Sequence, residues 1–189
     1  MKVAFIGLGV MGYPMAGHVL RAGLETCVFN RNAARAEQWC AEYGGDMAPT
    51  PAEAAKNADV VLVCVGNDDD VRAVVLGESG ALAAMKHGAI LVDHTTASAD
   101  LARELAGAAQ QQGKQFLDAP VSGGQAGAEN GALTAMIGGN PSTYDLAKPV
   151  MDCYSRFSKL LGPAGHGQLA KMVNQICIAG VLQGLAEGL

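Results

Sequence analysis

The sequence has 189 residues, of which 50% are hydrophobic and only 16% are charged. This length suffices for one α/β domain with a well-covered core, and the composition excludes a disordered chain. The formal net charge of −5 argues against nucleic acid as a partner, because nucleic-acid-binding proteins present a basic face.

The apolar segments have the length of strands or are interrupted by polar residues, so we expect no membrane span and no membrane partner. The N-terminus begins a strand without the features of a secretory signal, which predicts a cytoplasmic protein. No C-x-x-C pair is present, so we expect the cysteines to be reduced and buried rather than disulfides or zinc ligands. These five residues are Cys27, Cys40, Cys64, Cys153 and Cys177.

Three glycines in the spacing G-x-G-x-x-G interrupt an apolar run at the start of the chain, and a helix is predicted over 13–21. This order is the strand, turn and helix start of a dinucleotide-binding unit. Gly7 lets the chain turn sharply, Gly9 leaves room for a pyrophosphate, and Gly12 lets helix and strand pack closely. The unpaired N–H groups of the helix then face the phosphates. We expect the cofactor to bind at this turn, and the alternative is a purely structural tight turn. The residues expected to bind it are Gly7, Leu8, Gly9, Val10, Met11 and Gly12.

The residues after the second predicted strand, 25–30, bear on the choice of cofactor. Sites specific for NAD usually place Asp or Glu about 20 residues past the glycines, whereas a nearby Arg accommodates the 2′-phosphate of NADP. The sequence has Asn30 and Arg31 at this position and no acid. We therefore expect both residues to bind the cofactor and NADP(H) to be favoured over NAD(H). The alternative is a solvated Arg31 at the start of a helix.

A helix over 33–43 follows, in which Trp39 is expected to pack in the core. After a short helix over 52–57, residues 59–65 form the most strongly apolar strand. Its carboxyl end lies on the side of the sheet where ligands bind in open α/β folds. Val65 and Gly66, at this end, are predicted to contact the cofactor.

Three consecutive acids, Asp68, Asp69 and Asp70, come shortly afterwards. Adjacent acids at a helix start cannot all converge on one ion, so we expect helix capping and solvation rather than a metal site. A strand over 89–93 then runs into Thr96, whose hydroxyl is well placed to touch a cofactor. Ser98 is expected to cap the helix that follows, 99–112.

A strand over 115–119 leads into a second glycine-rich segment, which contains Ser122, Gly123 and Gly124. No G-x-S-x-G elbow and no partner residues support a nucleophilic serine. A hydroxyl beside two exposed glycine amides can instead cradle a carboxylate. These three residues are therefore predicted to bind the carboxylate of a small substrate.

The next predicted elements are a strand, a helix, a strand and a long final helix, over 132–139, 141–152, 154–160 and 168–189. Lys171 and Asn174 are three residues apart in the final helix and share one face. The apolar residues around Lys171 favour desolvation, which lowers the pKa of a lysine and suits it to proton transfer. The alternative is a lysine that snorkels from a surface helix.

Taken in order, these motifs resemble the β-hydroxyacid dehydrogenase family, which includes 3-hydroxyisobutyrate dehydrogenases, tartronate semialdehyde reductases and glyoxylate/succinic semialdehyde reductases. The resemblance covers the whole chain, and its last two motifs are specific to the family. The motifs are Gly7-Leu8-Gly9-Val10-Met11-Gly12, Asn30-Arg31, Asp93-His94-Thr95-Thr96, Asp118-Ala119-Pro120-Val121-Ser122-Gly123-Gly124 and Gly165-His166-Gly167-Gln168-Leu169-Ala170-Lys171-Met172-Val173-Asn174.

The resemblance implies a doubly wound, Rossmann-type, mostly parallel sheet, followed by the start of a long interdomain helix. It implies Lys171 as the catalytic acid/base, Asn174 as its hydrogen-bonding neighbour, Thr96 near the nicotinamide, and Arg31 as a mark of NADP preference. The implied binders of the substrate carboxylate are Ser122, Gly123 and Gly124. The implied reaction transfers a hydride between the nicotinamide and a small 3-hydroxy acid or aldehyde acid, without a metal.

We expect residues 1–164 to form the NADP-binding domain and 165–189 to begin a helix that leads, in the family, into an all-helical domain absent from this sequence. That domain supplies much of a dimer interface in the family, so we expect a homo-oligomer. One alternative is a truncated or non-catalytic NADP-binding interaction module. Another is an imine reductase-like enzyme, which would generally lack the lysine. A 6-phosphogluconate dehydrogenase is disfavoured by the loop expected at 125–131.

Overall fold

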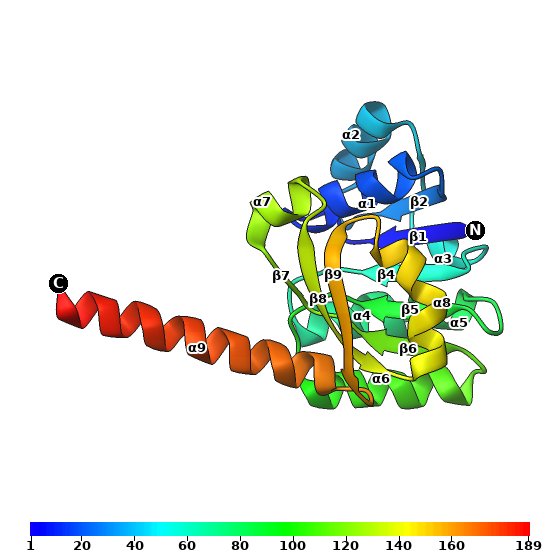
Figure 1. The fold of residues 1–189 in the computed structure, drawn as a ribbon. Helices are drawn as coiled ribbons and strands as arrows, with labels where there is room; N and C mark the ends of the chain where they lie inside the picture. Colours follow the sequence, from blue (N-terminus) through cyan, green and yellow to red (C-terminus); the bar gives the residue numbers. More distant parts are fainter.

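Nine strands form one sheet with helices on both faces (Figure 1), and the computed structural model describes all 189 residues. The strands are β1 (Lys2–Ile6), β2 (Glu25–Phe29), β3 (Asp46–Met47), β4 (Val60–Val63), β5 (Ile90–Asp93), β6 (Gln115–Asp118), β7 (Val121–Ser122), β8 (Leu133–Gly139) and β9 (Ser155–Gly162). The helices are α1 (Gly12–Arg21), α2 (Ala33–Tyr43), α3 (Pro51–Ala55), α4 (Asp68–Leu76), α5 (Ala81–Ala84), α6 (Ala99–Gln111), α7 (Gly124–Glu129), α8 (Pro141–Met151) and α9 (His166–Gly188).

The strand order places the ends of β1 and β4 at the centre of the ligand-binding edge. The strands run parallel in the order β3-β2-β1-β4-β5-β6. β8 pairs antiparallel with β6 and β7 and parallel with β9. Because the order reverses beside β1, the carboxyl ends of β1 and β4 form the switch point where open α/β sheets bind ligands. The doubly wound, mostly parallel fold expected from the sequence is confirmed.

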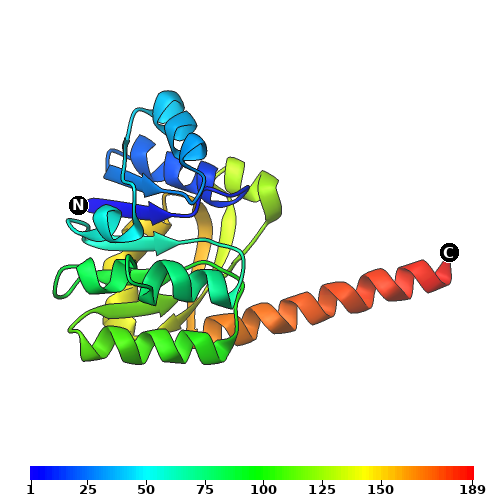
Figure 2. The ribbon, with the colours of Figure 1, turned by 180° about the vertical axis from the view of Figure 1, so that it is seen from behind.

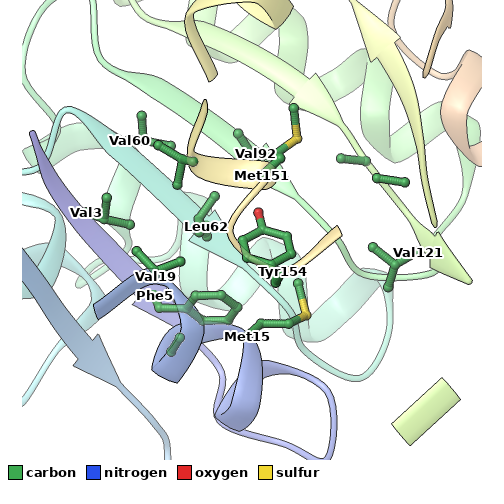
Figure 3. Close-up of a cluster of buried hydrophobic side chains, with 14 of the residues drawn as sticks. Val3, Phe5, Met15, Val19, Val60, Leu62, Val92, Val121, Met151 and Tyr154 are labelled. Carbon is green, nitrogen blue, oxygen red and sulfur yellow. The ribbon is translucent and has the colours of Figure 1, made fainter. Parts of the chain in front are cut away.

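Alternating side chains of the central strands supply both cores. Val3 and Phe5 of β1 belong to one buried cluster, whereas Ala4 and Ile6 belong to the other. The first cluster surrounds Tyr154 (Figure 3), which precedes β9 and is fully buried. Each large apolar side chain removed from water contributes about 1.5–3 kcal/mol. Strands that are apolar on both faces are therefore stable only between two helical layers. Figure 2 shows the helices of one layer from the opposite side.

A buried polar pair joins the end of β5 to the start of β9. One ring nitrogen of His94, Nδ1, lies 2.7 Å from the Ala119 carbonyl oxygen, and Nε2 lies 2.8 Å from the Tyr154 hydroxyl. Burial lowers the pKa of His94 to about 4, so the ring is neutral at physiological pH. Nδ1–H then donates to the carbonyl, and Nε2 accepts from the tyrosine. The second residue of the Asp93-His94-Thr95-Thr96 motif thus has a structural role.

The elements predicted from the sequence are found with boundaries that differ by at most two residues. The expectation of a loop over 125–131 is wrong, because α7 occupies most of it. This helix buries only Ala128, so the sequence carries no apolar stripe to indicate it. The short elements β3, α5 and β7 were not predicted, because two to four residues are too few to show a periodic pattern.

Two expectations about single residue types have different outcomes. Trp39 is fully buried, and its Nε1–H donates to the Tyr13 carbonyl at 3.1 Å, which confirms core packing. All cysteines are free, but the expectation that they are buried is wrong for Cys177, which is exposed, and the other four are half-buried. Cys177 lies on the part of α9 that leaves the sheet.

Helix α9 packs on the sheet only through its first turns and then projects away (Figure 1). Its buried residues are Gly167, Gln168 and Lys171. The helix has 23 residues and a window of mean hydropathy 1.3, so it is long and apolar enough to cross a membrane, contrary to the sequence expectation. Length and composition alone do not separate a membrane-spanning helix from an apolar helix that packs against protein. The expectation of no membrane partner stays a prediction.

Candidate functional site

The turn after β1 can be built only with glycine at two of its three glycine positions. Gly7 has φ +98°, and an added Cβ would overlap the carbonyl of Cys64. An added Cβ at Gly12 would overlap the carbonyl oxygen of Gly7. At Gly9, by contrast, an added Cβ would meet nothing within 4 Å, because it would project into open space. Gly7 and Gly12 are therefore needed for packing, and Gly9 keeps the cavity clear.

Backbone donors face this open space. The N–H groups of Gly9, Val10 and Met11 donate to no acceptor within the protein, and no side chain caps the start of α1. Unpaired N–H groups at a helix N-terminus bind phosphate groups. The turn thus fits the pyrophosphate of a dinucleotide.

A cavity of about 440 Å³ lies over this turn. Most of the predicted cofactor residues line it, namely Gly7, Gly9, Val10, Met11, Gly12, Asn30, Arg31, Val65 and Gly66. Leu8 does not line it, since its side chain is buried. The Leu8 N–H donates to Asn30 Oδ1 at 2.9 Å, so Asn30 also holds the turn in place.

Two charged side chains, Arg31 and Asp70, line this cavity. Arg31 follows β2, and its Nη1 lies 3.2 Å from Oδ1 of Asp70. A second cation, Arg35, is occupied elsewhere, because its Nε–H donates to the Leu8 carbonyl at 3.2 Å and its guanidinium stacks on Tyr13. Arg31 is therefore the arginine available to a 2′-phosphate.

The three consecutive acids of α4 point to different partners. Asp68 accepts the Ser98 N–H at 2.9 Å, Asp69 lies 3.6 Å from Arg72, and Asp70 pairs with Arg31. The side chain that caps α4 is Asn67, whose Oδ1 accepts the Asp70 N–H at 3.0 Å. No group of three potential metal ligands is found in the structure.

A second cavity, of about 580 Å³, continues from the first, and the two share Met11, Cys64, Val65 and Gly66. It gathers predicted residues from three separate elements, namely Thr96, Ser122, Gly123, Gly124 and Lys171. The Gly123 N–H donates to no protein acceptor. The glycine turn, the segment 122–124 that is predicted to bind a carboxylate, and Lys171 therefore lie along one continuous groove.

Lys171 is a lysine that is buried in this groove without an acidic partner. Its side chain is buried, with only 8% of the residue exposed, and it forms no salt bridge. Desolvation by burial lowers its pKa. A buried lysine without an acid partner is suited to proton transfer, and the interpretation as a snorkelling surface lysine is not supported.

The position of Lys171 depends on a carboxylate at the end of β6. Asp118 accepts the Gly165 N–H at 2.7 Å through Oδ1 and the Gln168 N–H at 2.9 Å through Oδ2. The first turn of α9 is therefore capped by a residue 47 to 50 positions earlier in the chain. Gly167 is required there, because an added Cβ would lie 2.8 Å from the Asp118 carboxylate.

The Gln168 side chain then ties α9 to the loop after β5. Its Nε2–H donates to the Thr95 carbonyl at 2.7 Å, and its Oε1 accepts the Ala97 N–H at 3.0 Å. The two bonded residues, Thr95 and Ala97, precede and follow Thr96. Lys171 lies three residues beyond Gln168 on the same helix, so the side chain that anchors the Thr96 loop stands within one helical turn of Lys171.

The comparisons with known proteins agree with this geometry. A family model described as the NAD binding domain of 6-phosphogluconate dehydrogenase matches residues 2–173. A probable 3-hydroxyisobutyrate dehydrogenase-like 1, mitochondrial, of Arabidopsis thaliana is 42% identical over 189 residues, which cover 100% of this chain and 56% of that protein. The chain belongs to the β-hydroxyacid dehydrogenase family. The resemblance seen in the sequence is confirmed, and the matched region is the N-terminal, nucleotide-binding domain of this family.

Two further members show how the domain sits in longer proteins. An uncharacterized oxidoreductase of Shewanella frigidimarina is 64% identical over 188 residues, which cover 100% of this chain and 65% of that protein. The structure of a Mycobacterium tuberculosis 3-hydroxyisobutyrate dehydrogenase with L-serine superposes with a TM-score of 0.92 at 34% identity, over 99% of this chain and 63% of that chain. Imine reductases, at 24% identity or less, share the fold alone. The chain thus spans less than two thirds of the length of these relatives.

Asn174, like Leu8, is a predicted site residue that does not line the groove of this dehydrogenase-family domain. Its Nδ2–H donates to Gln175 Oε1 at 3.3 Å, and it lines neither cavity. Its role as the neighbour of Lys171 stays a prediction. Gln175 lines the second cavity instead and was missed, although its spacing of four from Lys171 puts both on one helix face.

The desolvation of Lys171 predicts that removing its charge stabilises the fold. The folded-state pKa lies below the unfolded value, so near neutral pH the buried ammonium lowers the free energy of unfolding. This loss is full below the folded pKa and disappears as the pH rises past the unfolded value of about 10.4. We expect Lys171→Met to raise the thermal unfolding midpoint at pH 7 and the gain to shrink towards pH 10.5, as measured by circular dichroism.

Lys159→Met is the matched control for this measurement, because Lys159 is exposed and should show no such pH-dependent gain. A lower midpoint for Lys171→Met than for the unaltered protein at pH 7 would contradict the desolvation of Lys171.

Proposed function

We propose that the protein is an NADP(H)-dependent oxidoreductase that interconverts a small aldehyde acid and the matching hydroxy acid. The observation that supports this most strongly is the buried, unpaired Lys171 in one cavity with Thr96 and the Ser122 segment. The nicotinamide, when bound, supplies or accepts the hydride. The structure gathers no group of three or more His, Cys, Asp or Glu side chains that could hold a metal ion, and the proposed chemistry needs none.

Each part of the groove has a defined task in this proposal. The N–H groups of Gly9, Val10 and Met11 bind the pyrophosphate. Thr96, which lines the second cavity between the two residues bonded by Gln168, contacts the nicotinamide in this proposal.

The substrate end of the groove binds an acid and moves a proton. The Ser122 hydroxyl and the Gly123 N–H bind the substrate carboxylate. Lys171 delivers a proton to the carbonyl oxygen in reduction and removes it from the hydroxyl in oxidation. Burial lowers the pKa of the Lys171 amine below its usual value, which favours proton exchange with the substrate oxygen in both directions.

The preference for NADP(H) rests on Arg31, which lines the cofactor cavity and is not followed by an acid. The cytoplasmic location, the homo-oligomeric state and the division of the chain at residue 165 stay predictions.

The acid/base role of Lys171 is tested by following NADPH oxidation with a panel of small aldehyde acids. We expect Lys171→Met to lower turnover by roughly 100-fold or more, because a positioned acid/base contributes about 10²–10⁴-fold. NADPH binding should be unchanged, and Lys159→Met should keep full activity. Near-unaltered turnover by Lys171→Met would contradict the role.

The same panel tests the proposed reaction class. An unaltered protein that binds NADPH but reduces none of the aldehyde acids would favour the non-catalytic module. Reduction of a cyclic imine in their place would favour an imine reductase.

The cofactor preference is tested by measuring dissociation constants for NADPH and NADH. We expect Arg31→Ala to weaken NADPH binding by about ten-fold or more, because a charge-assisted bond to the 2′-phosphate is lost. NADH binding serves as the internal control and should change little. Equal affinities for the two cofactors in the unaltered protein would contradict the assignment.

A further inference from the structure

The partner of Arg31 has a position of its own in the cofactor groove. Arg31 follows β2, Asp70 lies in the first turn of α4 after β4, and these two strands flank β1 (Figure 1). Their ion pair therefore bridges the carboxyl end of β1, directly above the glycine turn. Arg31 and Asp70 are the only charged side chains that line this cavity.

The two members of this pair are held very differently. The Arg31 side chain is 89% exposed, whereas that of Asp70 is only 31% exposed. The Asp70 backbone is fixed by the Asn67 cap, and its carboxylate lies over Gly66, where an added Cβ would come within 2.5 Å of Oδ2. Exposed ion pairs contribute little to stability, so Arg31 can leave Asp70 at small cost when an anion arrives. Asp70 cannot leave.

We propose that Asp70 is a specificity-determining residue that opposes binding of the 2′-phosphate and thereby limits the preference for NADP(H) over NAD(H). The proposal rests on the function proposed above. A phosphate held by Arg31 lies within one side-chain length of the fixed carboxylate, and the two negative charges repel. The 2′-hydroxyl of NAD(H) carries no charge and can donate a hydrogen bond to the same carboxylate. Attraction by Arg31 and repulsion by Asp70 together set the ratio of the two affinities.

The test compares D70N with D69N in the full chain, with NADPH and NADH as probes in titrations that yield dissociation constants. We expect D70N to tighten NADPH binding by about three-fold to ten-fold and to leave NADH binding unchanged or weaker. The gain should shrink at high salt, which screens charges in the exposed mouth. D69N removes an equal charge from the same helix turn, but Asp69 is 97% exposed and lines neither cavity, so its effect should stay below about two-fold.

The outcomes separate this inference from the proposed function. NADPH affinity that is unchanged or weaker in D70N, in a protein whose NADPH binding depends on Arg31, overturns the role of Asp70 alone. Equal tightening in D69N also overturns it, because the effect would then reflect net charge. An unaltered protein that binds neither dinucleotide overturns the proposed function before Asp70 is tested.

Discussion

The structure depends on one carboxylate that caps a helix from another part of the chain. Asp118, at the end of β6, accepts N–H bonds from Gly165 and Gln168 and so sets where α9 starts. Both N–H groups belong to the first turn of a helix, where backbone donors have no intrahelical partner. Gln168 then passes this constraint to the loop after β5 through its two side-chain bonds. The distant end of the chain is thereby fixed to the middle of the sheet, and Lys171 faces the groove as a result. Beyond its first turns the helix leaves the sheet, so the contacts that hold α9 are confined to this end.

The groove itself is built from polar groups that the fold leaves without partners. The N–H groups of Gly9, Val10, Met11 and Gly123 donate to nothing within the protein. Lys171 has no acid beside it, and Arg31 is paired only across the mouth. Backbone N–H groups left without a protein acceptor, as at the N-terminus of a helix, are suited to bind an acceptor-rich ligand. The groups are ordered along the groove as a dinucleotide and an acid would require, with phosphate donors first and the carboxylate cradle and lysine last.

The fold and much of the site could be predicted from the sequence because their causes are local. Gly7 and Gly12 stand where any side chain would overlap the backbone, and uninterrupted apolar runs indicate β1 and β4. The contacts that fix the site are not local, and for this reason they were missed. Asp118 and Gln168 are 50 residues apart, and Arg31 and Asp70 are 39 apart. Asp70 was interpreted only as a helix-start residue, since no spacing rule connects it to Arg31. Helix α7 lacked an apolar stripe, and the exposure of Cys177 follows from the direction in which α9 leaves the sheet.

The central claim is that Asp118 holds Lys171 in its desolvated position. It is tested most directly by the pKa of Lys171 in D118N, followed through the ¹³C shift of its Cε carbon during a pH titration. Both carboxylate oxygens of Asp118 accept an N–H group from the start of α9, whereas the side chain of asparagine has only one acceptor oxygen. In D118N one of these N–H groups would face the amide NH₂ group, so the first turn of α9 would loosen. We expect the pKa of Lys171 to lie below the ordinary value in the unaltered protein and to rise towards it in D118N, with NADPH binding retained. A pKa equally lowered in a folded D118N protein would contradict the claim.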